Sequence, residues 1–330
     1  MIAVLGVMAA LAICGCSPKF SEFAFVQLTD PQIGFRDKTP GYVHSDSLFS
    51  RAVWEIGDYH KFKYAIMSHY DPRSKDHFRG PECVIPQMVI ITGDLVNDQR
   101  DALQDSIYRA NRAKIDVPVY EIPGNHDIRP WTPENHSNYL ALRGYDRFSF
   151  IYRGCAFIGI DSNCIVDSSD EDRGGDVRIS PSDKEAAAQA EAEQLEWLKE
   201  ELRKAAYGNR SRGADSKRGK DYNKEVRRKK GARHIFVFMH CPVILNDINE
   251  DNNYFNFPKK KRAEYIALFK EYGVDVVFVG HTHMDYDTTA EGIRFVTAGP
   301  VGSPLGRGYS GYELVTVSKD RVNCTFLPTR

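Results

Sequence analysis

Six short runs of apolar and β-branched residues constrain the fold of this chain more than any other feature of its sequence. Each run is five to seven residues long and ends at Gly, Asp, Asn, Pro or His. Continuous apolar runs of this length are typical of strands that are buried on both faces. The sequence therefore predicts strands over residues 23–29, 88–92, 117–122, 156–160, 234–239 and 274–279.

Helical patterns alternate with these predicted strands. Apolar residues recur at helical spacing over 48–66, 102–113 and 259–272. Three later apolar runs lie closer together and predict an antiparallel meander: 293–297, 312–317 and 321–326. Strands that alternate with helices and are followed by a meander predict a layered α/β domain with a mixed sheet.

A strongly charged segment over about residues 167–233 interrupts this pattern. Residues 167–201 hold twelve acidic and four basic residues, whereas residues 203–233 hold thirteen basic and three acidic ones. The Ala/Glu/Leu-rich stretch 185–206 predicts a helix with an apolar stripe of three leucines. We expect the whole segment to be a solvated surface insertion; the alternative is an electrostatic patch that binds an anionic substrate or surface.

The remaining length and charge favour a single soluble domain. Of the 330 residues, about 250 remain for a core once the charged segment and the N-terminal segment are set aside, which suits one large domain over 17–330. The 44 basic and 45 acidic residues give a net charge of −1. This balance gives no overall attraction to nucleic acid, so a nucleic-acid partner is disfavoured.

The N-terminus has its own apolar segment. Residues 1–13 are almost wholly apolar, and Cys14, Gly15 and Cys16 follow. The segment is too short to span a bilayer, which needs about 20 apolar residues. It predicts a signal peptide over 1–16 and export to the periplasm or cell envelope. The order of residues 13–16 resembles a bacterial lipobox, which implies a lipid anchor at Cys16 as the only membrane contact. The alternative is a buried N-terminal strand.

Polar residues of the kinds that bind metals stand directly after the predicted strands. The carboxyl ends of strands in an α/β sheet meet at one edge, where ligands bind. Asp, His, Asn and Gln side chains gathered there make a candidate metal site. Each cluster alone fits a turn, a helix cap or a rim histidine, but five in this order indicate a site. Its members are Asp30, Gln32, Asp94, Asn125, His126, Asp127, His240, His281 and His283.

These motifs resemble those of the calcineurin-like metallophosphoesterase family, from Asp30 to His283. The resemblance implies a four-layer αββα sandwich with two mixed β-sheets and two divalent metal ions at the carboxyl edge of the strands. By motif, Asp94 bridges the metals, Asp30 and His283 bind the first, and Asn125, His240 and His281 bind the second. His126 stabilises charge on the phosphate or protonates the leaving oxygen, and Asp127 orients it.

The first motif departs from the usual family pattern. The family usually has Asp-x-His there, whereas this chain has Asp30-Pro31-Gln32 and so resembles a branch of calcineurin-like phosphoesterase-domain proteins. An amide oxygen is a harder donor than imidazole and a poorer ligand for Zn or Fe. The first position is therefore expected to favour Mn or Mg, while Mn, Mg, Fe and Zn all stay open for the pair. Whether Gln32 binds a metal stays open too.

The leading functional hypothesis is hydrolysis of phosphate esters by a metal-activated water, with a phosphorylated small molecule or protein as substrate. Two metal ions offset the negative charge of the ester and lower the pKa of water. Two alternatives remain. A phosphodiesterase or nuclease would use the basic residues of 203–233, and a non-catalytic metal-binding surface lipoprotein would explain Gln32.

Overall fold

The computed structural model describes residues 20–57, 85–171, 179–208, 231–306 and 308–329. In this part of the chain, no helix is both long enough and apolar enough to cross a membrane. The predicted signal peptide over 1–16 and lipid attachment at Cys16 lie outside the described residues, as do residues 58–84, 172–178 and 209–230.

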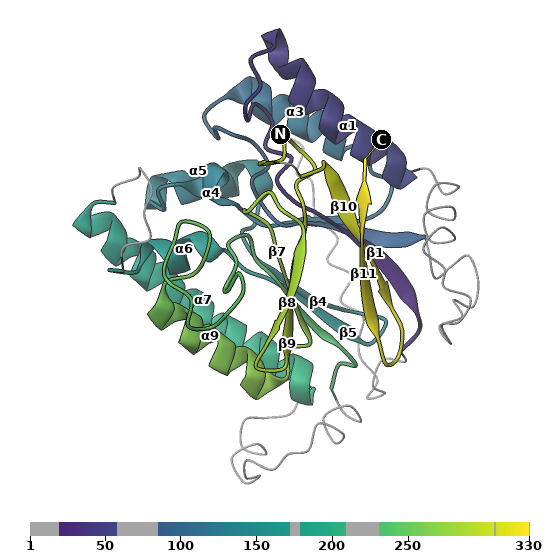
Figure 1. Cartoon of the computed structure of the whole chain (residues 1–330). Coiled ribbons are helices and arrows are strands. Elements are labelled where there is room, and N and C mark those ends of the chain that lie inside the picture. Colours follow the sequence, from purple (N-terminus) through teal and green to yellow (C-terminus); the bar gives the residue numbers. More distant parts are fainter. Residues whose placement is uncertain (1–19, 58–84, 172–178, 209–230, 307, 330) are drawn as a thin grey trace, which may run out of the picture.

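Two mixed sheets form the centre of the fold (Figure 1). The first sheet has the order β11-β10-β1-β2-β3, and the second has the order β4-β5-β6-β7-β9-β8. In the first, β1 pairs in parallel with β2, and β2 with β3, while β10 and β11 are antiparallel. In the second, β5, β6, β7 and β9 are parallel, and the outer strands β4 and β8 are antiparallel.

The strands of the first sheet are β1 (Phe23–Leu28), β2 (Pro86–Ile91), β3 (Val119–Glu121), β10 (Gly311–Val317) and β11 (Val322–Pro328). The strands of the second sheet are β4 (Phe148–Tyr152), β5 (Cys155–Gly159), β6 (Ile235–Phe238), β7 (Val276–Val279), β8 (Tyr286–Ala290) and β9 (Ile293–Thr297).

The helices are η1 (Pro40–Tyr42), α1 (Val43–Gly57), α3 (Ala102–Arg112), α4 (Asn125–Ile128), α5 (Pro133–Arg143), α6 (Ser162–Asp167), α7 (Pro181–Tyr207) and α9 (Lys259–Tyr272). Figure 1 shows α1 and α3 on the side of the first sheet and α7 and α9 on the side of the second.

Alternating strand residues build two separate cores. Side chains such as Phe25, Phe157 and Phe238 face the space between the sheets, where aromatic rings pack against one another. Their neighbours along each strand point outward and pack with the helices. Because the side chains of a strand alternate between its faces, runs that are apolar on every residue serve both cores. The result is the predicted αββα sandwich with two mixed sheets.

All six leading strand predictions are confirmed, within one or two residues at each end. The helix predicted over 259–272 matches α9, and the one predicted over 48–66 begins earlier, at Val43, and is described to Gly57. Two strands were not predicted. β4 and β8 lie at the edges of the second sheet, and their alternately exposed residues give no continuous apolar run.

The predicted meander is wrong for residues 293–297. β10 and β11 do form an antiparallel hairpin, but β9 belongs to the other sheet, between β7 and β8. Strand order depends on non-local pairing, and closeness in sequence did not reveal it.

The charged segment is also corrected in part. Residues 185–206 do form a helix, within α7, but its buried side chains, including Leu198 and Leu202, pack into the main core. α7 is therefore a part of the helical layer and not a solvated insertion. The acidic residues alternate with an apolar stripe, which the charge count alone conceals.

Candidate metal centre

The loops that follow the strands of both sheets meet at one edge of the sandwich. The backbone N–H of Asp30, after β1, donates to the Gly93 carbonyl oxygen after β2, and Gly280 N–H, after β7, donates to the His240 carbonyl oxygen. The N–H of His281 donates to the Asp30 carboxylate across 251 positions of sequence. Parallel pairing puts these strand ends side by side, so the predicted residues converge.

Several of the predicted ligands have a strained backbone. Asp30, Asp94, His281 and His283 all have φ between 49° and 69°, and Gln32 has φ of 37°. This left-handed region is uncommon for residues other than glycine, and such residues cluster at functional sites. The sharp turns aim these side chains into the space between the strand ends.

Two motif glycines allow the loops to approach each other closely. A Cβ on Gly124 would clash with the backbone nitrogen of Asp94, and one on Gly280 would clash with the Thr29 hydroxyl. The space that a side chain would need is therefore filled by the Asp94 backbone at Gly124 and by the Thr29 side chain at Gly280. This close approach explains why the third and fifth motifs each contain a glycine.

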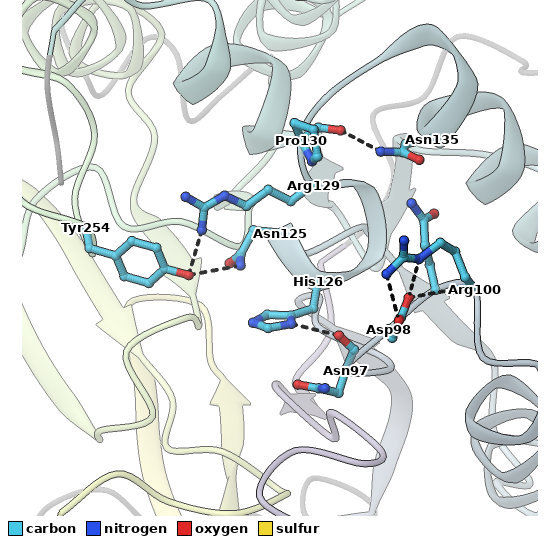
Figure 2. A pocket seen from close by; sticks show the side chains of 10 residues that line it. Asn97, Asp98, Arg100, Asn125, His126, Arg129, Pro130, Asn135 and Tyr254 are labelled. Atoms are coloured by element: carbon cyan, nitrogen blue, oxygen red, sulfur yellow. Dashed lines mark hydrogen bonds and ion pairs between the residues drawn. The ribbon is translucent and has the colours of Figure 1, made fainter. Parts of the chain in front are cut away.

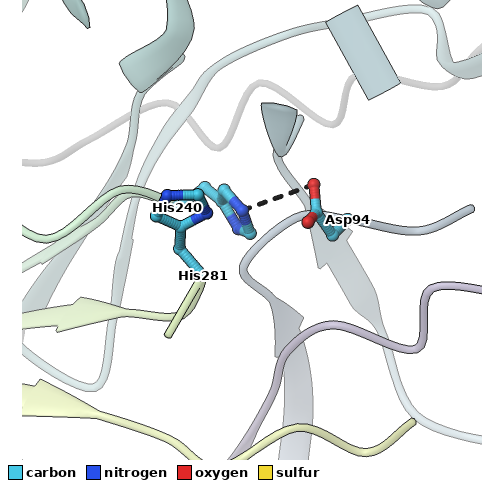
Figure 3. Close-up of side chains that lie close together, drawn as sticks. All are labelled: Asp94, His240 and His281. Carbon is cyan, nitrogen blue, oxygen red and sulfur yellow. Dashed lines mark ion pairs between the residues drawn. The ribbon is translucent and has the colours of Figure 1, made fainter. Parts of the chain in front are cut away.

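One group of residues that could hold a metal ion consists of Asp94, His240 and His281 (Figure 3). All three are buried, and their ligand atoms lie within 4.8 Å of one another. The Nε2 atom of His240 is 3.3 Å from Asp94 Oδ1. Its Nδ1 donates to the Thr92 carbonyl oxygen at 2.7 Å, so Nε2 is the ring atom that faces the carboxylate and that a metal ion would bind.

Asn125 completes this group. Its Oδ1 is 3.2 Å from His240 Nε2, and its Nδ2 donates to the Tyr254 hydroxyl at 3.2 Å. The amide is therefore oriented with its oxygen toward the ligand atoms and its nitrogen away from them. His240 Nε2 therefore faces the Asp94 and Asn125 oxygens, and these three atoms suit a cation bound between them.

A second group consists of Asp30, Asp94 and His283, also buried and within the same distance of one another. His283 Nε2 is 3.3 Å from Asp30 Oδ1, and His283 Nδ1 donates to the Ser303 carbonyl oxygen at 2.7 Å. Asp94 is common to both groups, which places its carboxylate between them.

Two buried oxygens, one of the second group and one of Gln32, lack hydrogen-bond partners among the described residues. They are Asp30 Oδ1 and Gln32 Oε1. A buried polar atom without a partner is costly, and a cation bound by the second group would satisfy the Asp30 oxygen. The residues of the two groups therefore fit divalent metal ions, while a metal ligand at Gln32 stays a prediction.

The ionisable groups of the centre stabilise one another electrostatically. Burial opposes ionisation of Asp94, but His240 and His126 outweigh that effect and hold its pKa below the ordinary value. Burial likewise disfavours a charged His240, but the carboxylates of Asp94 and Asp30 raise its pKa to about 9. The carboxylates thus attract positive charge to this point, which a metal ion would supply.

His126 lies beside both groups. Its backbone N–H donates to Asp94 Oδ1 at 2.8 Å, and its Nδ1 donates to the Asn97 carbonyl oxygen at 2.9 Å. With Nδ1 as the donor, Nε2 of the half-buried ring is the atom free for proton transfer.

The structure places Asp127 differently from its predicted role. Its carboxylate accepts hydrogen bonds from the backbone N–H groups of Gly124, at 2.8 Å, and Leu95, at 3.1 Å. It therefore holds the two loops together, while the Asn97 carbonyl orients the His126 ring. Burial, and then the charge of Asp94, raise the pKa of Asp127 to about 7.

A pocket of about 660 Å³ opens beside Asn125 and His126 (Figure 2). Eight of its ten lining residues are not among the predicted site residues, and Arg129 and Tyr254 are two of these eight. The Tyr254 carbonyl oxygen accepts from His281 Nε2 at 3.1 Å, and its hydroxyl accepts from Asn125. Tyr254 thus touches two residues of the metal centre. It follows no predicted strand, so no sequence pattern marked it.

The sequence matches a known family. A family model described as calcineurin-like phosphoesterase matches residues 51–285. The bovine protein "Serine/threonine-protein phosphatase CPPED1" is 28% identical over 244 residues, which are 72% of this chain. The zebrafish protein of the same name is 24% identical over 322 residues, 91% of this chain and 82% of its own. The chain spans 66% of the bovine relative's length, just under two thirds.

Solved structures share the fold. The purple acid phosphatase PPD1 of yellow lupin aligns with a TM-score of 0.57 over 95% of this chain and 52% of its own, at 14% identity. A dimetal phosphatase from Danio rerio aligns with a TM-score of 0.52 over 93% of this chain and 96% of its own, also at 14% identity. At this identity the likeness concerns the fold alone.

Proposed function

This chain belongs to the calcineurin-like phosphoesterase family, and from that premise we propose that it is a metal-dependent hydrolase of phosphate monoesters. The observation that carries the proposal is the pair of buried ligand groups that share Asp94 and adjoin His126. A shared carboxylate suits two cations, because each of its oxygens can bind one of them.

The proposed ligands divide as the motifs suggest. Asp30, Gln32 and His283 would hold one metal ion, Asn125, His240 and His281 the other, and Asp94 both. When bound, two divalent cations would offset the negative charge of the phosphate ester and lower the pKa of the attacking water. The carboxylates of Asp30 and Asp94 would neutralise only part of the positive charge of the two cations, so the centre would remain positive and attract the substrate.

His126 is the proposed proton donor. Its Nδ1 is fixed on the Asn97 carbonyl oxygen, so Nε2 is the atom that would give a proton to the leaving oxygen. Removing such a group typically costs about 10²–10⁴-fold in rate. A metal-binding protein without activity would have no need for this arrangement.

The substrate class is proposed with support from the relatives. The CPPED1 proteins carry the name of serine/threonine-protein phosphatases, which favours a phosphorylated protein or a small phosphomonoester as substrate. The basic residues that favoured a nuclease lie mostly in 209–230, outside the described residues.

A substrate panel tests the proposal. Protein loaded with Mn, Mg, Zn or Fe is assayed on p-nitrophenyl phosphate, bis(p-nitrophenyl) phosphate and a phosphoserine protein, with metal content measured in parallel. We expect phosphate release from the monoesters that requires metal and that His126→Ala loses while still binding metal. Faster diester cleavage would instead establish the phosphodiesterase, and bound metal without any turnover would establish the non-catalytic lipoprotein.

Export is proposed separately. The apolar segment 1–13 and the cysteines that follow support a signal peptide with lipid attachment at Cys16. Expression in a bacterium with labelled fatty acid is expected to label the wild-type protein and not Cys16→Ser. Unlabelled protein of full length in the cytoplasm would contradict this.

A further inference from the structure

The pocket beside the metal centre adjoins it on one side only. Its walls come from the loop 97–100, from residues 125–135 and from Tyr254 (Figure 2). Of the predicted site residues, only Asn125 and His126 line it. If His126 protonates the leaving oxygen, as in the function proposed above, then the part of the substrate beyond that oxygen lies in this pocket. The inference below rests on that proposed function.

Arg129 is held in the wall of this pocket by Tyr254. Its Nη1 donates to the Tyr254 hydroxyl at 2.9 Å, and its guanidinium carbon lies 5.0 Å from the centre of the tyrosine ring. These two contacts fix the half-buried side chain, which reduces the entropy that a ligand would have to pay on binding it. Figure 2 shows the guanidinium beside Asn125.

The charge of Arg129 is not neutralised within the structure. Among the residues that the structure describes, no carboxylate oxygen lies within 4.0 Å of its guanidinium. A guanidinium has five N–H donors, and the hydroxyl of Tyr254 takes one of them. The remaining donors can bind an oxyanion, preferably in a bidentate manner.

The other charges of the pocket lining cancel. Asp98 is the single carboxylate among the lining residues, and Arg100 pairs with both of its oxygens, at 2.9 Å and 3.0 Å. Arg129 therefore gives the lining its net positive charge. The amides of Asn97, Gln99 and Asn135 supply further polar groups, and Gln99 Oε1 is buried without a hydrogen-bond partner.

We propose that the substrate is a phosphomonoester whose alcohol part is polar and carries a second anionic group, and that Arg129, positioned by Tyr254, binds this second group. A carboxylate or a second phosphate would supply the same oxyanion chemistry. An uncharged, apolar alcohol part would leave the guanidinium and the pocket amides without partners.

Two matched substrates test this proposal. 2-Phosphoglycerate and glycerol 2-phosphate differ in one group, a carboxylate in place of a hydroxymethyl group. We expect kcat/KM for 2-phosphoglycerate to be about 10–100-fold higher, as for a charge-assisted hydrogen bond. In Arg129→Met this ratio is expected to fall to about one, because the loss is greater for the carboxylate substrate. Arg129→Lys is expected to retain part of the preference.

A control separates this effect from general charge attraction. Arg51→Met removes an exposed arginine on α1 and is expected to leave the ratio unchanged. A preference that persists in Arg129→Met would overturn the proposal. So would an equal loss on both substrates, since Arg129 would then bind the phosphate that they share, and so would the absence of any preference in the wild type.

Equilibrium binding tests the role of Arg129 without requiring hydrolysis of the ester, which is the proposed function. Calorimetric titration of the two phosphates into metal-loaded His126→Ala protein is expected to show tighter binding of 2-phosphoglycerate, lost in the double variant with Arg129→Met. If no phosphate ester is hydrolysed, the proposed function is wrong. The difference in affinity between the two phosphates would still show whether Arg129 binds the second anionic group. Equal affinities would refute that role even if the protein is an active phosphatase.

Tyr254→Phe tests the positioning role. This change keeps the ring under the guanidinium but removes the hydroxyl that accepts from Arg129 and Asn125. We expect KM for 2-phosphoglycerate to rise more than KM for glycerol 2-phosphate. Identical changes in both KM values would contradict a role for Tyr254 in holding Arg129.

Discussion

The two ligand groups share a carboxylate but differ in the atoms that they offer. The group of Asp94, His240 and His281, with Asn125, offers two imidazole nitrogens, and its amide is already oriented by Tyr254. The group of Asp30, Asp94 and His283 offers one imidazole, and its Asp30 Oδ1, like Gln32 Oε1, has no hydrogen-bond partner in the described part of the chain.

From this difference we expect the two positions to prefer different metals. Imidazole suits Zn and Fe, whereas carboxylate and amide oxygens suit Mg and Mn. The position with Gln32 is thus expected to be the oxygen-rich and more weakly binding one. Substitutions at Asp94, at His240 and His283, at Gln32 and at Asp127 test whether the two positions differ in this way.

Asp94→Ala is expected to have the largest effect, because it removes a ligand from both groups. Metal content should fall at both positions, and monoester hydrolysis should fall by about a thousandfold or more, since a catalytic metal is worth several kcal/mol. Elemental analysis and phosphate release measure the two outcomes. Full metal content in the folded variant would show that Asp94 is not a metal ligand shared by the two groups.

His240→Ala and His283→Ala form a matched pair, because each removes an imidazole from one group only. Each is expected to lose one metal ion per chain while retaining the other. Titration with Zn and Mn should show that His240→Ala loses mainly the Zn-preferring position. Loss of both ions in either variant would mean that the groups act as one site.

Gln32→His tests the chemical difference directly. An imidazole at this position is expected to make the two groups more alike and to shift the metal preference from Mn toward Zn or Fe. Gln32→Ala is the control, with metal affinity at that position expected to fall by about 10–100-fold, the range seen when outer contacts of a metal site are lost. If neither change moves the metal preference, Gln32 is not a ligand.

Asp127→Asn is expected to have the smallest effect of these substitutions and to affect both ligand groups equally. The amide of the variant can still accept from the backbone of Gly124 or Leu95, but with one oxygen in place of two. We expect a loss of stability of about 1–3 kcal/mol, measured by denaturant unfolding, with both metals retained. Selective loss of one metal ion would show that Asp127 supports one group more than the other.

Local patterns predicted the six leading strands to within one or two residues at each end. The apolar runs gave the six strands, and the polar residues after them converge as expected. The match to the family begins at residue 51 and therefore leaves out Asp30 and Gln32. Hydrogen bonds to Gly93 and His281 place Asp30 in the centre, and the backbone N–H of Gln32 donates to the Asp94 carbonyl oxygen at 2.8 Å.

Other features were beyond the reach of the sequence for physical reasons. The sheet that contains β9 depends on pairing with β7, and the role of α7 depends on which of its faces is buried. Arg129 and Tyr254 lie 125 positions apart, and neither has a distinctive local pattern. Their contact results from the packing of two loops.

By itself, the sequence determined where strands end and which chemical groups stand there, because strand burial and turn chemistry depend on neighbouring residues. How these groups combine follows from the tertiary structure: Asp94 is shared by both groups, Asp127 accepts from the backbone while the Asn97 carbonyl orients His126, and the Arg129 guanidinium, held by Tyr254, lines the pocket. Such juxtapositions depend on strand order and loop packing, which are properties of the whole fold and not of any segment.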